Sequence, residues 1–191
     1  MQNGLLIVVS APSGAGKRTV LQRLAETESG LATTVSATTR APRAGEIEGR
    51  DYYFLSREVF DRRVTAGDFV EWAEVHGHRY GTLQSELDRL TASGKDVVIE
   101  IDVQGMRNLR TLRKDMISVF IVAPSQAELE RRLRERGTNS QEDIALRLRN
   151  AEMEMAGRHE YDYIVINDEL DRAAADLRAI LRAEHCRAER Q

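Results

Sequence analysis

The residues with the clearest chemical role form a glycine-rich segment near the N-terminus. It runs Ser10-Ala11-Pro12-Ser13-Gly14-Ala15-Gly16-Lys17-Arg18-Thr19. Gly14 and Gly16 permit backbone conformations in which successive N–H groups point at one phosphate. The ammonium of Lys17 can reach the β- and γ-phosphates of a nucleotide held there. These residue types in this order predict a phosphate-binding loop, in which every residue from Ala11 to Thr19 is a candidate nucleotide contact.

The loop departs from the pattern GxxxxGK[ST] at two positions. Ala11 stands at the place of the first glycine, and Arg18 stands at the place of the hydroxyl residue that binds Mg²⁺. Thr19 comes one position later. We therefore expect Mg²⁺ to be held through Thr19 or through water, and both arrangements stay open. A glycine-rich turn that binds no ligand is the alternative interpretation.

A second group of side chains suits the phosphate of an acceptor molecule. Arg40 and Arg43 lie three positions apart, with Pro42 stiffening the segment between them. Two guanidinium groups can clamp one phosphate through paired N–H donors. Tyr52 and Tyr80 each offer a hydroxyl to the same group. This set predicts a site for a phosphorylated acceptor.

One carboxylate in this region predicts which base the acceptor carries. Glu71 lies in the sequence Val70-Glu71-Trp72-Ala73-Glu74. An ionised carboxylate only accepts hydrogen bonds. Guanine presents N1–H and N2–H₂ side by side, whereas adenine presents neither. A buried Glu71 would therefore favour guanine, because leaving it unpaired against adenine costs about 1–3 kcal/mol.

These groups need rigid elements to hold them. Short apolar runs predict strands buried on both faces, at Leu5–Val9, Val97–Ile101, Ile117–Val122 and Tyr163–Ile166. Amphipathic stretches predict helices at Lys17–Glu28, Ser85–Ala92, Gln104–Lys114, from a capping box at Ser125 and Glu128 to Gly137, from Ser140 to about Gly157, and from Leu170 to about Arg187. Their alternation predicts an α/β sandwich around a parallel sheet.

Residues 34–82 interrupt this alternation. Short strand-like runs surround a predicted helix at Arg57–Ala66, and His76-Gly77-His78 predicts a hairpin turn. We expect a mixed, largely antiparallel insertion here. A second, arginine-rich insertion is expected around Gly137–Arg149.

Composition narrows the class of protein. The 191 residues carry a net charge of −3 and 5% are aromatic, which argues against a basic or base-stacking nucleic-acid binder. Cys186 is the only cysteine, so a reducing compartment, the cytoplasm, is expected. The apolar run at the N-terminus is too short for a signal peptide or a membrane span. We expect neither a nucleic-acid nor a membrane partner, and the sequence leaves the oligomeric state open.

Seven motifs in order make the chain resemble the guanylate kinase family over almost its whole length. They are Ser10–Lys17, Thr38–Glu46, Glu71–Glu74, Tyr80–Thr82, Ile101–Gly105, Arg136–Thr138 and Val165–Asp168. The resemblance implies Mg²⁺-dependent phosphoryl transfer from ATP to GMP. It also implies a P-loop NTPase-type three-layer α/β sandwich with a parallel central sheet. That domain would fill residues 1–191, with a core at about 1–35, 83–136 and 157–191, a GMP-binding insertion at about 36–82 and a small helical lid at about 137–150.

The resemblance further implies roles for single positions. Residues expected to act in catalysis are Lys17, Arg40, Arg43, Arg132, Arg136 and Arg147, the last three as lid arginines. Residues expected to bind GMP are Ser36, Arg40, Arg43, Glu46, Tyr52, Glu71, Tyr80, Thr82 and Glu100. Asn167 and Asp168 are expected beside the adenine of ATP, and Asp102 is expected with Thr19 on the Mg²⁺ side.

Two other interpretations stay open. The first keeps the fold and changes the acceptor, to another nucleotide or a phosphorylated sugar. The second is a catalytically silent peptide-binding module of the guanylate-kinase-like type, toward which the departures at Ala11 and Arg18 lean. The intact Gly14, Gly16 and Lys17 favour the enzyme.

Overall fold

The computed structural model describes residues 4–75, 77–135 and 141–190, which fall into two compact units. Unit 1 is Met1–Ile7 with Leu31–Met116, and unit 2 is Val8–Gly30 with Ile117–Gln191. The boundary lies inside the first strand, β1 (Leu6–Ser10), whose five residues are all buried. Neither unit is therefore one continuous stretch of chain.

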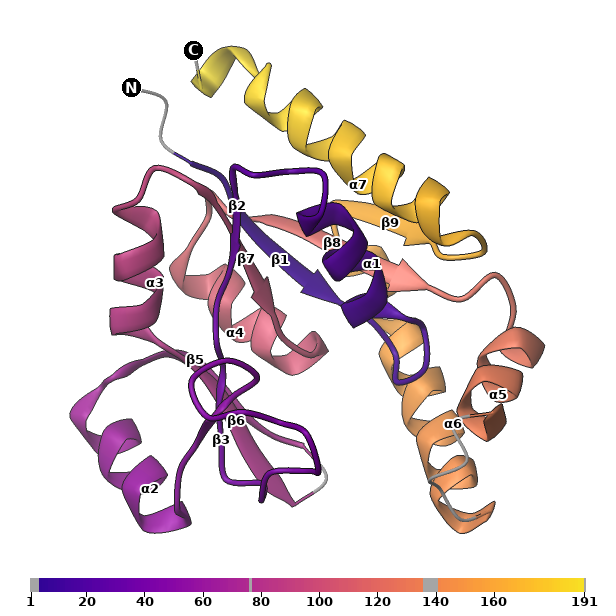
Figure 1. The fold of residues 1–191 in the computed structure, drawn as a ribbon, viewed down its shortest axis with the longest axis horizontal. Helices are drawn as coiled ribbons and strands as arrows, with labels where there is room; N and C mark the ends of the chain where they lie inside the picture. Colours follow the sequence, from indigo (N-terminus) through magenta and orange to yellow (C-terminus); the bar gives the residue numbers. More distant parts are fainter. Residues whose placement is uncertain (1–3, 76, 136–140, 191) are drawn as a thin grey trace. The chain divides into compact units, whose positions relative to one another are not determined.

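Unit 1 contains most of the strands of the molecule (Figure 1). In chain order it holds β2 (Leu31–Thr33), β3 (Ala37–Thr38), β4 (Tyr53–Phe54), α2 (Arg57–Ala66), β5 (Phe69–Val75), β6 (His78–Leu83), α3 (Gln84–Thr91), β7 (Asp96–Glu100) and α4 (Val103–Leu112). Helix α4 packs against β5, and α3 packs against β6 and β7. The short strand β2 was not predicted, since three residues carry too little periodicity to be recognised.

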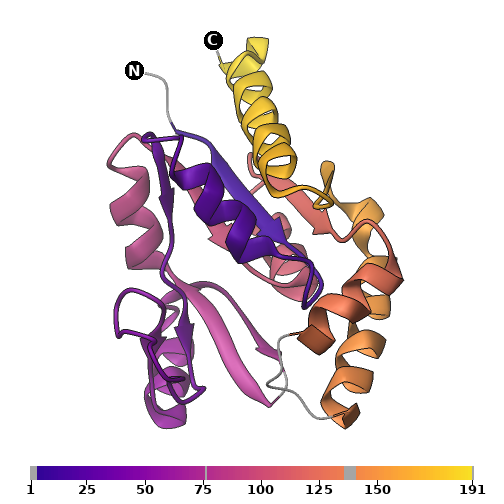
Figure 2. The same ribbon diagram turned by 45° about the vertical axis from the view of Figure 1, so that its right-hand side comes forward.

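Unit 2 contains most of the long helices. After the end of β1 it holds α1 (Lys17–Ala25), β8 (Ile117–Val122), α5 (Gln126–Glu135), α6 (Gln141–Ala156), the 3₁₀ turn η1 (Arg158–Glu160), β9 (Tyr163–Ile166), α7 (Leu170–His185) and η2 (Ala188–Arg190). Helices α1 and α7 lie side by side in both ribbon views (Figures 1 and 2). Arg23 Nε donates to Asp171 Oδ1 at 2.7 Å across this pair.

The central sheet has the strand order β2-β7-β1-β8-β9. In unit 1, β2 and β7 pair in parallel with Ala32 opposite Val97, and in unit 2, β8 and β9 pair in parallel with Val119 opposite Tyr163. The pairings of β2 with β7 and of β8 with β9 are thus parallel, as the predicted α/β arrangement requires. The alternation of strand and helix along the chain is also as predicted.

Strand β9 corrects one expectation. Predicted to be buried on both faces, it leaves Ile164 48% and Ile166 50% exposed, while Val165 is buried. The reason is its place at the end of the sheet order, with α7 packed against it. An edge strand covered on one face alternates inward and outward residues.

Residues 37–83 form the predicted mixed insertion. Its sheet has the order β4-β3-β6-β5, in which β3 and β4 are parallel and the other neighbours are antiparallel. Ala37, Phe60 and Leu83 make a small buried core. The rings of Phe60 and Phe69 stack with centroids 4.4 Å apart, which fixes α2 against β5.

Helix α5 begins as predicted, but with half of the predicted capping box. Ser125 Oγ accepts the backbone N–H of Glu128 at 3.1 Å. The Glu128 carboxylate binds Arg131 and Arg132 instead of returning to the cap. The predicted end of this helix at Gly137 and the predicted start at Ser140 lie outside the described residues.

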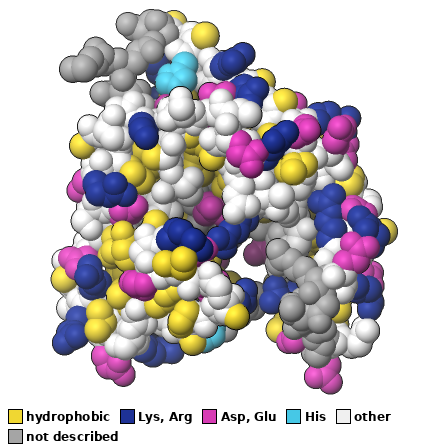
Figure 3. Space-filling view, viewed as in Figure 1, with side chains coloured by type: hydrophobic (Ala, Val, Ile, Leu, Met, Phe, Trp, Pro, Cys, Tyr) yellow, Lys and Arg dark blue, Asp and Glu magenta, His cyan; other side chains and the backbone are white. Residues whose placement is uncertain are grey.

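Charged side chains of both signs are spread over one face of the molecule. On the face drawn in Figure 3, the described Lys and Arg side chains are interspersed with Asp and Glu. Among the described residues, no helix is long and apolar enough to cross a bilayer.

Candidate active site

The phosphate loop of unit 2 has the backbone that its glycines predict. Gly14 and Gly16 have φ values of 93° and 90°, in the left-handed region that other residues avoid. Ala15 N–H donates to Pro12 O at 3.0 Å and closes the turn. Gly16 is the N-cap of α1 and supplies no side-chain acceptor. The N-terminus of α1, with its positive dipole end, therefore directly follows the loop, as anion binding requires.

Asn167 and Arg132 bind this loop from other elements of unit 2. Asn167 was predicted to lie beside the adenine of ATP, and Arg132 was predicted to be a lid arginine. Asn167 Nδ2 donates to Ala15 O at 2.7 Å. The Arg132 guanidinium spans three partners, because Nε donates to Glu128 Oε1 at 2.7 Å, Nη2 to Asn167 O at 2.9 Å and Nη1 to Ala15 O at 3.5 Å. In this structure Arg132 therefore supports the loop. Its predicted contact with the transferring phosphoryl group stays a prediction.

The other lid arginines differ in what the structure describes. Arg147 Nη1, on α6, donates to Ser13 Oγ of the loop at 2.8 Å. Arg136 and residues 137–140 of the predicted lid lie outside the described residues. The remaining predicted lid residues form the first turns of α6, which continues to Ala156.

The residues that follow the loop are more open to solvent. Lys17 is half-buried, whereas Arg18 and Thr19 are exposed on the first turn of α1. Thr19 can therefore present its hydroxyl to a ligand at that end of the helix. Asp168 accepts hydrogen bonds from Glu169 N–H and Arg172 Nε, so its predicted position beside adenine stays a prediction.

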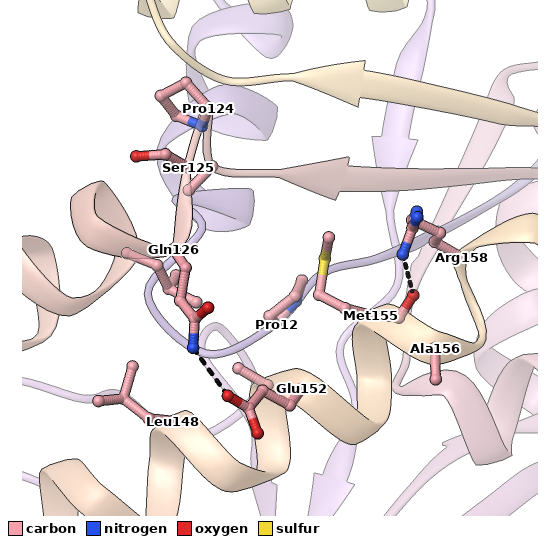
Figure 4. Close-up of a pocket in the computed structure, with 12 residues that line it drawn as sticks. Pro12, Pro124, Ser125, Gln126, Leu148, Glu152, Met155, Ala156 and Arg158 are labelled. Carbon is pink, nitrogen blue, oxygen red and sulfur yellow. Dashed lines mark hydrogen bonds between the residues drawn. The ribbon is translucent and has the colours of Figure 1, made fainter.

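An apolar pocket of about 440 Å³ lies behind the loop in unit 2 (Figure 4). Pro12 forms one wall, Leu129 and Leu148 come from α5 and α6, and the polar rim carries a hydrogen bond of 2.7 Å from Gln126 Nε2 to Glu152 Oε1. The buried cluster of Ala15, Leu129, Leu133 and Ala151 adjoins it. The loop thus rests on α5 and α6.

In unit 1, the acceptor arginines are held by an acidic neighbour. Both Nη2 bonds of Arg40 go to the Glu46 carboxylate, at 2.8 and 3.0 Å, and Arg43 N–H donates to Glu46 Oε2 at 2.7 Å. The hydrogen bond from Arg40 holds the pKa of Glu46 below its usual value. Glu46, predicted to bind GMP, therefore orients the Arg40 guanidinium and binds the Arg43 backbone.

Aromatic rings surround the Arg40 guanidinium. It lies 5.3 Å from the ring centroid of Tyr52 and 5.9 Å from that of Phe54, within cation–π range. The rings of Tyr52 and Tyr80 meet edge to face at 6.1 Å. Of the four predicted phosphate contacts, Arg40, Tyr52 and Tyr80 therefore lie together.

Glu71 is buried in unit 1, at 5% exposure. Its Oε1 accepts the hydroxyl of Thr82 at 2.9 Å. Burial raises the pKa of Glu71 to about 7, and the neighbouring Asp102 carboxylate adds to the rise. A desolvated carboxylate with one hydroxyl partner retains acceptor capacity for a ligand that brings N–H donors.

The other predicted contacts of unit 1 lie around these groups. Asp102 is the N-cap of α4, and its Oδ1 accepts Gly105 N–H at 2.7 Å. Ser36 O accepts Tyr53 N–H at 2.9 Å. Glu100 is the last residue of β7. Burial is the main cause of the raised pKa of Tyr52, and the Glu100 carboxylate adds to the rise. Asp102 thus lies beside Glu71, and its predicted Mg²⁺ contact stays a prediction.

Sequence analysis gave Glu128 only a capping role. Its carboxylate has a pKa lowered to about 2, first by the hydrogen bond from Arg131 and then by that from Arg132. Glu128 therefore orients the arginine that supports the phosphate loop. The available signal was the spacing of an acid three and four positions before arginines on a predicted helix.

The fold and the phosphate loop together define a class. A parallel α/β sheet whose first strand leads through a glycine loop into a helix is typical of P-loop nucleotide-binding proteins. A shikimate kinase structure from Bacteroides thetaiotaomicron has a TM-score of 0.52 at 17% identity, covering 93% of this chain and 98% of its own. At that identity the likeness concerns the fold alone.

Closer relatives define the family. The family model described as guanylate kinase matches residues 3–184. A guanylate kinase from Caldanaerobacter subterraneus subsp. tengcongensis is 45% identical over 189 residues, 99% of this chain and 92% of the relative. A crystal structure of guanylate kinase from Anaplasma phagocytophilum has a TM-score of 0.83 at 35% identity, covering 100% and 91% of the two chains. The chain belongs to the guanylate kinase family, and the predictions of family and fold class are confirmed.

Proposed function

We propose that this chain transfers the γ-phosphoryl group of ATP to GMP and releases ADP and GDP. Family membership supports the reaction class. The buried Glu71 carboxylate, with Thr82 as its hydroxyl partner, is the structural observation that favours guanine as the base. The protein acts on small-molecule substrates, and its lone cysteine suits the reducing cytoplasm.

The acceptor side binds GMP through complementary charge and hydrogen bonds. Arg40 and Arg43 bind its phosphate, with Tyr52 and Tyr80 as hydroxyl donors. Glu71 accepts from N1–H and N2–H₂ of guanine. The acceptor phosphate is itself the nucleophile and is ionised near neutral pH, since its second pKa is about 6. The reaction therefore needs no general base.

The donor side binds ATP through the phosphate loop of unit 2. Backbone N–H groups of the loop and the N-terminus of α1 surround the phosphates, and Lys17 neutralises the β- and γ-phosphate charge. Arg147, held at Ser13, adds a further cation at the loop. Catalysis is alignment and charge stabilisation, because the transferring group carries spread negative charge.

The proposal includes Mg²⁺. Magnesium keeps several water ligands and binds mainly through substrate phosphates plus one or two protein oxygens. The exposed Thr19 hydroxyl on the first turn of α1 fits that requirement. Within the described ranges, no three His, Cys, Asp or Glu side chains form a metal site. When bound, Mg²⁺ neutralises phosphate charge and aligns the donor.

The decisive assay is ADP release from Mg·ATP with GMP, AMP, CMP, UMP or no acceptor. We expect turnover with GMP and background release otherwise. Turnover with another acceptor instead would keep the kinase and reject the guanine assignment. If the folded protein shows no turnover, Arg18, which replaces the hydroxyl residue of the loop pattern, is the first residue to test. Activity gained in Arg18→Ser would then indicate an impaired enzyme, and continued silence would favour a binding module.

A further inference from the structure

We infer that Gly105 is a specificity-determining positioning residue, whose missing side chain leaves the space that the Glu71 carboxylate occupies when it selects guanine. The inference rests on the proposed function and extends it to a residue that touches no substrate. It concerns unit 1 alone, where α4 packs against β5.

The contact between these two elements is tight at one point. A Cβ added to Gly105 would lie 2.7 Å from Glu71 Oε2, 3.1 Å from Ile101 Cβ and 3.2 Å from Asp102 Oδ1. The first distance is shorter than carbon–oxygen van der Waals contact allows. Either the carboxylate or α4 would have to move. Because Glu71 is buried and bonded to Thr82, a move of its carboxylate changes where its acceptor oxygens point.

The helix itself gives no reason for glycine at this position. Gly105 is the third residue of α4, and it is absent from the glycines with positive φ. Alanine in such a position is more favourable to a helix by about 0.5–1 kcal/mol. The backbone conformation accepts any residue, so the demand for glycine comes from the neighbouring side chains, of which the Glu71 carboxylate is the nearest.

The same residue also fixes the second carboxylate. Gly105 N–H donates to Asp102 Oδ1 at 2.7 Å and so caps α4. One residue therefore places both acids, Asp102 through its amide and Glu71 through its missing Cβ. Two adjacent acceptors, the buried Glu71 and the half-buried Asp102, suit a ligand edge with adjacent N–H donors, which guanine has and hypoxanthine has only in part.

The test is steady-state kinetics of Gly105→Ala with GMP and with IMP, which lacks the 2-amino group. We expect the KM for GMP to rise at least tenfold, with kcat changed less than threefold and the KM for ATP unchanged. The preference for GMP over IMP should shrink at least fivefold. A purely structural defect would weaken both acceptors equally, so this ratio separates the two causes.

Gly30→Ala is the matched control, because a Cβ at Gly30 meets nothing within 4 Å. It should leave all constants unchanged. The double variant Glu71→Asp/Gly105→Ala completes a double-mutant cycle, in which the shorter aspartate leaves space for the added Cβ. If the conflict is with Glu71, Gly105→Ala should cost at least fivefold less in the Glu71→Asp background. Should Gly105→Ala not fold, the double variant should regain the fold.

Three results would overturn the inference. They are an unchanged KM and GMP-to-IMP ratio in Gly105→Ala, equal losses in both backgrounds, or an unfolded double variant. A wild-type protein that does not phosphorylate GMP would instead reject the proposed function, so the two failures are distinguishable.

Discussion

Glu71 combines two requirements that oppose each other. Its burial at 5% exposure raises the pKa to about 7, whereas accepting two guanine donors requires the ionised form. In the free protein, Glu71 therefore keeps its proton to a higher pH than an exposed glutamate does. A ligand with N–H donors offsets the lost hydration of the ionised form. The proposed guanine contact would therefore couple ligand binding to proton release at this residue.

The raised pKa of Glu71 predicts that the free energy of unfolding depends on pH. The folded Glu71 keeps its proton up to about pH 7, whereas in the unfolded chain its pKa has the ordinary value of 4.5. The folded state thus binds more protons between these values, and stability falls as pH rises through that window. Relative to Glu71→Gln, the wild-type free energy of unfolding should fall by about 3 kcal/mol from pH 4.5 to 8.

Urea unfolding of both proteins across this range measures the difference. Glu74→Gln is the comparison on the same strand, because Glu74 is 49% exposed. A difference that also grows for Glu74→Gln would assign the effect to something other than burial. A flat difference for Glu71→Gln would contradict the prediction.

Glu46 holds the guanidinium of Arg40, which we propose binds the phosphate of GMP. The side chains of Arg40 and Glu46 are 11% and 13% exposed. Glu46→Gln replaces a two-oxygen acceptor by an amide that accepts through one oxygen only. We expect a rise of about tenfold in the KM for GMP, consistent with charged hydrogen bonds worth about 1.5–3 kcal/mol. The KM for ATP should not change.

The matching change is again Glu74→Gln, which removes the pairs of a 49% exposed carboxylate with Arg57 and Arg79. It should alter neither constant, because surface pairs contribute little. Equal effects of the two substitutions would show that Arg40 needs no anchor.

At the scale of elements, the phosphate loop of unit 2 is held in place by hydrogen bonds from α5 and from the turn after β9. Arg132 is the shared side chain, with three bonds and 23% exposure. Arg132→Met should raise the KM for ATP about tenfold and lower the free energy of unfolding by about 2 kcal/mol, since buried carbonyl acceptors lose charged donors. Arg131→Met, at a 56% exposed position on the same helix, should cost under about 1 kcal/mol.

Kinetics with ATP and GMP, together with thermal unfolding, separate these effects. A rise in the KM for GMP alone in Arg132→Met would contradict a role in supporting the loop. Equal destabilisation by both variants would show that the bonds to Ala15 and Asn167 contribute nothing beyond a surface pair.

Sequence patterns predicted the strong elements and missed what tertiary contacts decide. The runs that begin at Val97 and Ile117 are apolar enough to be predicted as strands from the sequence. The strand at Leu31–Thr33 is too short, and the exposure of Ile164 depends on which strand ends the sheet, which periodicity does not contain. Some predicted ends differ from the observed ones by up to three residues, as for the helix predicted to end at Glu28, which ends at Ala25.

The candidate site was predicted in its residue types and less in its pairings. The phosphate loop and Glu71 could be named because each residue type implies its own chemistry. That Glu46 holds Arg40, and that Arg132 reaches Ala15, depends on side-chain directions far apart in sequence. Such pairings follow from packing, which spacing alone does not determine.

At the scale of the whole molecule, the two units share one strand. Leu6 and Ile7 belong to unit 1, and Val8 to Ser10 belong to unit 2. We expect a single cooperative unfolding transition, since neither unit keeps its part of β1 if the other melts. The chain carries one reporter for each, Trp72 in unit 1 and Cys186 in unit 2.

Tryptophan fluorescence and the anisotropy of a dye on the exposed Cys186 should therefore give coincident melting midpoints. Far-UV circular dichroism supplies the reference curve. Midpoints that separate beyond error would show that the units unfold independently.

The pairing of α1 with α7 also has a consequence during protein synthesis. Helix α1 leaves the ribosome early with Val20, Leu21 and Leu24 on its apolar face, but α7, which packs against it, is made last. At about 5–20 residues per second, that face waits on the order of 10 s for its partner. The nascent chain therefore presents an uncovered apolar helix to chaperones and to neighbouring chains until translation is almost complete.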